Sequence, residues 1–266
     1  MSFSIQGRTA IVTGAAAGVG LAIARHFAEA GARVVLADMD EKRLRAAAED
    51  IDGETRLFTC DLRQKLSVAN LLSMTVDDFD RVDVLVNASR QVQPSDPLDP
   101  EGDAMATMLE QNLMTALRMS QAVAKRMIAQ SEADGDDDGV AGSIVNLSSI
   151  AARRTQPDLM AYSVSCAALD QMTRGMAVAL APHRIRVNAV AFGSVMSDSL
   201  KGALKEHAEF RADIRENTPL HRIAAAREVA EAVQFLASDG SGFVTGEILT
   251  VDGGRSLIDA VSAPAH

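Results

Sequence analysis

The sequence has few of the features that mark secreted, membrane or nucleic-acid-binding proteins. Its 266 residues include two cysteines, Cys60 and Cys166, too few for a disulfide framework, which indicates a reducing compartment. The net charge is −10 and the pI is near 5.0, whereas nucleic-acid partners require clustered Lys and Arg. The N-terminus has no basic start before an apolar run, and no apolar run approaches the ~20 residues of a membrane helix. We therefore expect a soluble, cytoplasmic protein with no membrane and no nucleic-acid partner.

The segments that are present alternate between two kinds. Longer stretches with helical periodicity, such as residues 20–30 and 41–50, separate short runs rich in β-branched residues. The predicted strands cover residues 8–13, 33–37, 56–60, 82–86, 143–147, 184–190 and 247–251. Alternation of this kind predicts right-handed βαβ units, and nearly continuous apolar strands indicate burial on both faces. Because no linker divides the chain, we expect residues 1–266 to form one Rossmann domain, a doubly wound parallel sheet of about seven strands with helices on both faces.

Residues 132–139 form an acidic, low-complexity patch with the sequence EADGDDDG. Asp136, Asp137 and Asp138 are oxygen ligands that could bind a cation, but the alternating ligands and set glycine of a calcium loop are missing. We expect a solvated surface loop and no metal site.

A glycine-rich turn follows the first predicted strand and opens a helix. Gly14, Gly18 and Gly20 let the backbone turn tightly and approach a pyrophosphate, which the free N–H groups and dipole of a helix N-terminus favour. Asp38 ends the second strand, 18 positions after Gly20. A carboxylate there can accept hydrogen bonds from both ribose hydroxyls of an adenosine and would repel a 2′-phosphate. The pattern predicts an NAD(H) site, and the alternative is that Asp38 merely caps the helix that follows.

The spacing Gly-x-x-x-Gly-x-Gly resembles that of the short-chain dehydrogenases/reductases, and further motifs continue the resemblance over residues 6–255. These motifs are Cys60-Asp61-Leu62, Asn112, Asn146-Leu147-Ser148-Ser149, Tyr162 thirteen positions after Ser149, Arg186-Val187-Asn188-Ala189-Val190, and GEILTVDGG at 246–254. The resemblance implies these cofactor contacts: Gly14, Ala17, Gly18, Val19, Gly20, Asp38, Asp61, Leu62, Asn87, Ala88, Tyr162, Gly193 and Val195.

The activity implied by the resemblance is hydride transfer between NAD(H) and a small carbonyl or alcohol substrate. Tyr162 would be the general acid or base, Ser149 would hydrogen-bond the substrate oxygen, and Asn112 would hold a water of the proton relay. The plain alternatives are that Ser149 only caps a strand end and that Tyr162 is a core residue.

The expected pattern breaks at Cys166, which stands four positions after Tyr162 where the family has a catalytic lysine. An ammonium ~4 Å from the phenol at an effective dielectric of ~20 contributes about 4 kcal/mol, or about three pKa units. A thiol cannot replace it. We therefore expect Tyr162 to stay protonated at neutral pH and catalysis to be slow and biased toward reduction, unless Arg153, Arg154 or His183 substitutes.

Other departures accompany this one. Asn87-Ala88-Ser89-Arg90 replaces Asn-Asn-Ala-Gly after the fourth strand, and Phe192-Gly193 replaces Pro-Gly after the sixth. Together with Cys166 they suggest relaxed catalytic constraint. The alternative function is therefore a catalytically inactive, dinucleotide-binding relative that serves as a sensor, scaffold or partner subunit.

We expect residues 6–150 to form the cofactor half and 151–256 the catalytic half, with a substrate lid at 194–220. The resemblance also implies a homo-oligomer, most often a tetramer, built from helices at 103–130 and 159–180. The first of these contains five methionines that could pack an interface or fill the core: Met105, Met108, Met114, Met119 and Met127.

Overall fold

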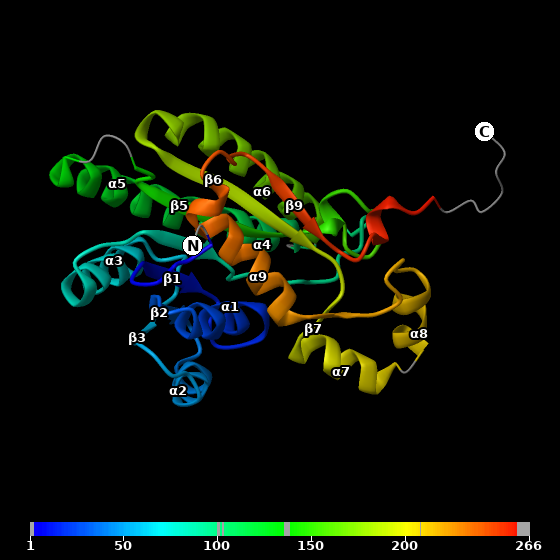
Figure 1. The fold of residues 1–266 in the computed structure, drawn as a ribbon. Coiled ribbons are helices and arrows are strands. Elements are labelled where there is room, and N and C mark those ends of the chain that lie inside the picture. The colour runs from blue at the N-terminus through cyan, green and yellow to red at the C-terminus, as the bar shows by residue number, and fades with distance from the viewer. Residues whose placement is uncertain (1–2, 100–101, 103, 136–138, 208, 260–266) are drawn as a thin grey trace.

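A seven-stranded parallel sheet lies at the centre of the protein (Figure 1). The computed structural model describes residues 3–99, 102, 104–135, 139–207 and 209–259. The strand order is β3-β2-β1-β4-β5-β6-β9. The strands are β1 (Thr9–Thr13), β2 (Arg33–Asp38), β3 (Thr55–Thr59), β4 (Val84–Asn87), β5 (Gly142–Ser149), β6 (Ile185–Phe192) and β9 (Ile248–Val251). The order reverses between β1 and β4, and this doubly wound topology confirms the predicted single-domain Rossmann fold.

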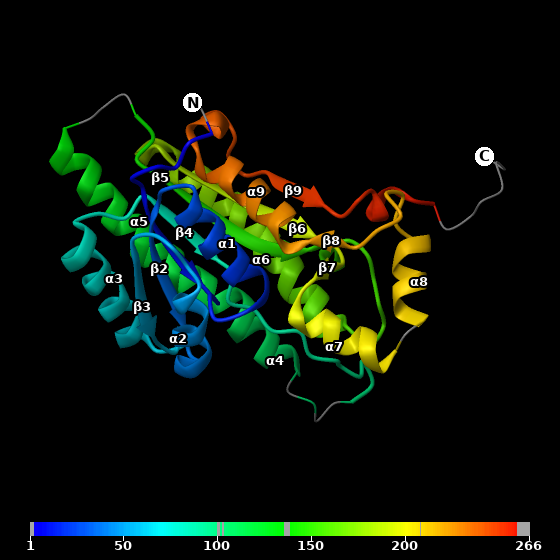
Figure 2. The same cartoon turned by 60° about the horizontal axis from the view of Figure 1, so that its bottom comes forward.

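Helices cover both faces of this sheet (Figure 2). One face packs against α1 (Gly18–Glu29), α2 (Glu41–Glu49) and α9 (Ala226–Ala237), through buried side chains such as Phe27, Leu44 and Val233. The other face packs against α3 (Lys65–Phe79), α5 (Thr115–Asp134) and α6 (Met160–Leu180), through Leu71, Met119 and Ala177. Within the described part of the chain, no helix is both long and apolar enough to span a bilayer.

The neighbouring strands β5 and β6 are longer than predicted. Each has eight residues, all buried, and the ladder between them continues to the pair Ser149 and Phe192. The prediction ends them at Leu147 and Val190 because it follows the β-branched run, whereas strand pairing continues through residues that are not β-branched. Ser149 and Phe192 are thus rigid neighbours at the carboxyl edge of the sheet.

The helix predicted at 103–130 has three parts: α4 (Ala104–Met108), a π-helical turn η1 (Leu109–Met114), and α5. Because α5 continues to Asp134, the surface loop predicted from residue 132 is wrong for its first three residues; Asp136, Asp137 and Asp138 lie outside the described residues. Met108, Met119 and Met127 are fully buried and fill the core.

The segment predicted as a lid, 194–220, contains the short strand β7 (Val195–Met196) and the helices α7 (Asp198–Glu206) and α8 (Glu209–Glu216). Strand β7 pairs with β8 (Ala224–Ala225) in a separate two-stranded sheet. In Figures 1 and 2 both helices stand beyond the carboxyl ends of the strands, outside the helical layers of the sheet.

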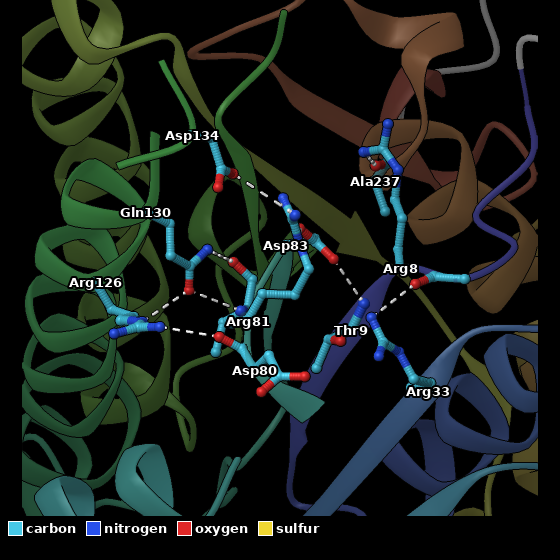
Figure 3. Close-up of polar contacts among 12 residues, drawn as sticks. Arg8, Thr9, Arg33, Asp80, Arg81, Asp83, Arg126, Gln130, Asp134 and Ala237 are labelled. Carbon is cyan, nitrogen blue, oxygen red and sulfur yellow. Dashed lines mark hydrogen bonds and ion pairs between the residues drawn. The ribbon is translucent and has the colours of Figure 1, made fainter. Parts of the chain in front are cut away.

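A polar network ties the opposite, amino edge of the sheet together (Figure 3). The carboxylate of Asp83 accepts hydrogen bonds from Thr9 N (2.8 Å) and from Arg81 Nε (2.7 Å). Gln130 binds both backbone groups of Val82, accepting from its N–H at 2.9 Å and donating to its carbonyl at 3.0 Å. These bonds satisfy the backbone N–H of Thr9 in β1 and both backbone groups of Val82 just before β4, and through Gln130 they connect this edge to α5.

A hollow of about 410 Å³ opens at this amino edge, lined in part by Arg8, Arg33 and Arg81. Their guanidinium groups bind Ala237 O, Gly7 O and the Asp83 carboxylate, respectively. Since ligands of open α/β sheets bind at the carboxyl ends of the strands, the candidate site is sought there.

Candidate active site

The glycine turn between β1 and α1 is packed so closely that two of its glycines have no room for a side chain. A Cβ on Gly14, whose φ is +65°, would lie 2.7 Å from Ala88 O, and one on Gly20 would lie 2.2 Å from Gly14 O. A Cβ on Gly18 would make an ordinary contact of 3.9 Å with Ser197 Cβ, but its φ of +59° is a conformation that favours glycine. Helix α1 begins at Gly18 with no side chain capping it at Ala17. The turn with Ala17 and Val19 therefore presents free backbone N–H groups, as an anion site requires.

Asp38 turns its carboxylate toward this glycine turn. Its Oδ2 accepts a hydrogen bond from Ala16 N at 3.1 Å and its Oδ1 accepts one from Asp40 N at 3.0 Å. Asp40 caps helix α2 instead, by accepting from Arg43 N. The interpretation of Asp38 as the helix cap is therefore wrong.

Asp61 and Leu62 follow β3 at the same edge. Arg63 binds both carboxylate oxygens of Asp61 at 2.8 to 3.1 Å, and these hydrogen bonds hold the pKa of Asp61 below its usual value. Leu62 is buried. Burial, together with Asp38 and Asp61, raises the pKa of the neighbouring Cys60 thiol to about 12, so this cysteine is an unreactive core residue.

The loop after β4 is fixed to β1. Thr13 Oγ1 accepts hydrogen bonds from Ala88 N (3.0 Å) and Ser89 N (3.1 Å). The Asn87 side chain points into the protein, where its amide donates to Asn146 Oδ1 at 2.8 Å and to Ser120 Oγ at 3.0 Å. The side chain of Asn87 is thus engaged within the core.

Asn112 lies in the π-helical turn η1 and binds the backbone of the same loop. Its Oδ1 accepts from Gln91 N at 2.8 Å, and its Nδ2 donates to Gln91 O at 3.0 Å and to Ser165 Oγ at 3.0 Å. The π-turn adds one residue to the helical repeat, so that Asn112 is buried toward α6.

Ser149 and Tyr162 meet at the carboxyl edge of the sheet. Ser149 is the last residue of β5, and its Oγ accepts from Ala151 N at 3.2 Å. Tyr162 lies in the first turn of α6 and is only 4% exposed, and Cys166 lies one helical turn further on, also buried. Because Tyr162 and Cys166 are four residues apart in α6, their side chains lie next to each other on one face of the helix.

The hydroxyl of Tyr162 has a cationic partner that the sequence did not predict. Arg90 Nη1 donates to Tyr162 Oη at 2.8 Å and to Ser148 O at 3.3 Å. The guanidinium carbon lies 4.2 Å from the centre of the Phe192 ring, a cation–π geometry. In the sequence Arg90 and Phe192 stand out as separate departures, and only the tertiary fold shows that they share a contact.

The pKa of Tyr162 is raised above its ordinary value, mainly because burial disfavours the phenolate. Arg90 and Ser149 act in the opposite direction on this pKa, whereas Cys166 adds to the rise. Burial also raises the pKa of the Cys166 thiol. Both groups are therefore neutral at pH 7.

Gly193 and Val195 follow β6 near this site. A Cβ on Gly193 would lie 3.0 Å from Asp252 Cβ, and Gly193 N donates to Val251 O at 3.2 Å. Val195 is buried in β7. The predicted positions thus gather at the carboxyl ends of β1 to β6, on both sides of the point where the strand order reverses.

Comparison with known proteins agrees with this arrangement. A family model described as enoyl-(acyl carrier protein) reductase matches residues 14–256. The 7alpha-hydroxysteroid dehydrogenase of Escherichia coli K12 is 32% identical, over 94% of both chains. The cis-4-hydroxycyclohexanecarboxylate dehydrogenase of Sinomonas cyclohexanicum is 35% identical over 94% of this chain and 97% of its own.

Solved structures give the same result. A 7alpha-hydroxysteroid dehydrogenase structure, in complex with NADH and 7-oxo glycochenodeoxycholic acid, superposes with a TM-score of 0.87 at 31% identity, over 95% of this chain and 96% of the other. The fold, the motifs and these relatives lead to one conclusion: the chain belongs to the short-chain dehydrogenase/reductase family of oxidoreductases.

Proposed function

We propose that the protein is an NAD(H)-dependent oxidoreductase acting on a small carbonyl or alcohol. The observation that supports this proposal is that Ser149 and Tyr162 lie at the same carboxyl edge of the sheet as the glycine turn. Members of the family use nicotinamide cofactors, and the bound cofactor would supply or accept the hydride.

The residues of the glycine turn fit a dinucleotide. The missing side chains at Gly14 and Gly20 let β1, α1 and the loop after β4 approach each other, and the uncapped start of α1 favours the negative charge of a pyrophosphate. In this proposal the backbone of Ala17, Gly18, Val19 and Gly20 holds the pyrophosphate.

The preference for NAD(H) over NADP(H) rests on Asp38. Its carboxylate faces the glycine turn through Ala16 N, the position from which it would accept the ribose hydroxyls and repel a 2′-phosphate. Asp61, Leu62, Asn87 and Ala88 would complete the adenosine side, Asn87 and Ala88 through their backbone. Gly193, Val195 and Tyr162 would lie on the nicotinamide side.

Tyr162 would exchange the proton and Ser149 would hydrogen-bond the substrate oxygen. Because the pKa of Tyr162 is raised by burial, its hydroxyl can give a proton to a carbonyl oxygen at neutral pH but cannot accept one from an alcohol. We therefore propose that the enzyme works mainly as a reductase and that Cys166, at the position expected for lysine, leaves it slower than related enzymes. Asn112 would hold the relay water through its backbone, since Gln91 and Ser165 engage its amide.

One observation favours a second candidate, a catalytically inactive dinucleotide-binding protein. Arg90 occupies a hydrogen-bonding position on the hydroxyl of Tyr162, the atom that would meet the substrate. An arginine that held this hydroxyl away from the substrate would leave binding without turnover.

The test is a fluorescence titration with NADH and, in parallel, NADPH. The chain has no tryptophan, so the emission of a bound reduced nicotinamide is read against a low protein background. We expect saturable binding of NADH in preference to NADPH, followed by oxidation of NADH when small ketones and aldehydes are added. Binding without turnover of any carbonyl would support the second candidate, and no binding of either dinucleotide would contradict both.

We also propose a homo-oligomer, most simply a tetramer, packed through α5 and α6. Helix α6 exposes Val164 at 41% and Val178 at 78%, apolar side chains that a second copy could cover. Light scattering coupled to size exclusion would give a mass of four chains, and a mass of one chain would contradict the proposal.

A further inference from the structure

Arg90, Cys166 and Phe192 are far apart in the sequence, yet Arg90 and Cys166 both act on Tyr162 and Phe192 contacts Arg90. Arg90 follows β4, Cys166 lies in α6 and Phe192 ends β6. The Arg90 guanidinium donates to Tyr162 Oη at 2.8 Å and stacks on Phe192 at 4.2 Å. All three are positions where the residue differs from the one that the family resemblance leads us to expect, so the differences form one physical cluster.

The backbone on either side of Arg90 is held firmly. Before it, Thr13 Oγ1 binds Ala88 N and Ser89 N. After it, the Asn112 amide binds both backbone groups of Gln91 at 2.8 and 3.0 Å. The side chain is then fixed by Ser148 O and the Phe192 ring. An arginine whose neighbouring backbone and head group are both restrained loses little further entropy when it binds the phenol.

We infer that Arg90 is the positioning residue that supplies, from the loop after β4, the positive charge that the Cys166 position in α6 lacks. The inference rests on the proposed function, in which Tyr162 is the proton donor. When the Tyr162 O–H bond breaks and its proton forms a new O–H bond on the carbonyl oxygen, the phenolate left behind accepts the Arg90 N–H. A bound reduced nicotinamide would supply the hydride, a hydrogen with its bonding electron pair, for the new C–H bond at the carbonyl carbon and would be left oxidised. The phenolate then recovers a proton from solvent.

The other cations near the motif are placed less well. Arg153 and Arg154 are exposed just after β5, and neither acts on the phenol as Arg90 does. His183 follows the far end of α6, 21 positions from Tyr162, or about 30 Å along a helix. The ionisable groups that act on the phenol, among the residues described, are Arg90 and Cys166. Asp170 lies one turn beyond Cys166 and acts on that thiol.

The test uses the fact that Tyr162 is the one tyrosine of a chain without tryptophan. Its ionisation can be followed in the apoprotein by tyrosinate absorbance. After 3-fluorotyrosine incorporation the ionisation can be followed by ¹⁹F NMR, with a single resonance because the chain has one tyrosine. Fluorine also lowers the phenol pKa, so the transition is reached at a lower pH, where alkaline unfolding interferes less. We compare the wild type with Arg90→Met, Arg90→Lys and the exposed control Arg154→Met.

We expect Arg90→Met to raise the measured pKa of the phenol by about 1 to 3 units, as removal of a neighbouring opposite charge does. Arg90→Lys should stay closer to the wild type, and Arg154→Met should match it. An unchanged pKa in Arg90→Met would overturn the inference. If circular dichroism shows that Arg90→Met is unfolded, Arg90→Gly replaces it in the same comparison.

Turnover provides a second, separable readout. Cys166→Lys should raise the rate of carbonyl reduction at least tenfold in the Arg90→Gly background. It should give no such gain in the wild type, because Arg90 already supplies a positive charge at the phenol and repels the new lysine. An equal gain in both backgrounds would overturn the inference. A third combination is a wild type that reduces no carbonyl while its phenol pKa still depends on Arg90. That combination would contradict the proposed function and still support the electrostatic role of Arg90.

Discussion

The side-chain amide of Asn112 forms a two-point contact with Gln91, accepting from its N–H at 2.8 Å and donating to its carbonyl at 3.0 Å. Asn112→Ala would leave both backbone groups of Gln91 without this partner. We expect the free energy of unfolding to fall by about 1 to 3 kcal/mol, measured by urea denaturation. Gln111→Ala is the matched control, since Gln111 uses its backbone carbonyl to bind Thr115; an equal loss in both variants would contradict the prediction.

Asp38 provides a prediction for cofactor preference. Asp38→Asn removes the charge that would bind the ribose hydroxyls, and we expect the Kd for NADH to rise about 10- to 100-fold while that for NADPH falls or stays constant. Asp40→Asn is the control, because Asp40 caps α2 through Arg43 N and an asparagine caps equally well. Parallel fluorescence titrations measure both constants, and an unchanged ratio of the two would remove Asp38 from the cofactor site.

The pH dependence of turnover follows from the raised pKa of Tyr162. Reduction needs the protonated phenol, so its rate should be flat through neutral pH and fall only as the pH passes the raised pKa. Alcohol oxidation needs the phenolate, so its rate should rise about tenfold per pH unit below that pKa. Steady-state profiles in both directions measure this, and brisk alcohol oxidation at pH 7 would be incompatible with it.

Tyr162→Phe should lower carbonyl reduction by about 100- to 10,000-fold, the range of a lost general acid. NADH binding should change much less, because the phenyl ring is retained. Thermal unfolding of the variant is the control for the fold. A variant with near wild-type turnover would show that another group supplies the proton.

Two glycines should respond in opposite directions to alanine. Gly20→Ala would place a Cβ 2.2 Å from Gly14 O, so we expect a loss of several kcal/mol or failure to fold. Gly175 lies in the middle of α6, where a methyl group would meet no atom of another described element within 4 Å, and Gly175→Ala should stabilise by about 0.5 to 1 kcal/mol. Chemical denaturation of both variants measures these effects, and a stabilised Gly20→Ala would contradict the proposed packing.

The sequence alone was sufficient to predict the sheet and its parallel connections, whereas the roles of the candidate site residues stay predictions. Strand and helix periodicity is local, and the motifs that carry the resemblance lie at strand ends, which meet at one edge of a parallel sheet. The direction of the Arg90 side chain could not be predicted, because it depends on Phe192, Ser148 and Tyr162 from three other elements. The π-turn around Asn112 has no sequence signature of its own. The end of α5 at Asp134 was missed because acidic composition was interpreted as loop.

The amino-edge network of Thr9, Asp83 and Gln130 lies at the other end of the strands from Ser149 and Tyr162. Strand β5 has eight residues, which separates its two ends by about 23 Å. Substitutions more than 7 to 10 Å apart that share no partners act additively on stability. Changes at the carboxyl edge, such as Arg90 and Cys166, therefore leave the stabilising contribution of the amino-edge network unchanged. Substitutions that alter the chemistry of the site can accumulate while the sheet keeps that contribution to its stability.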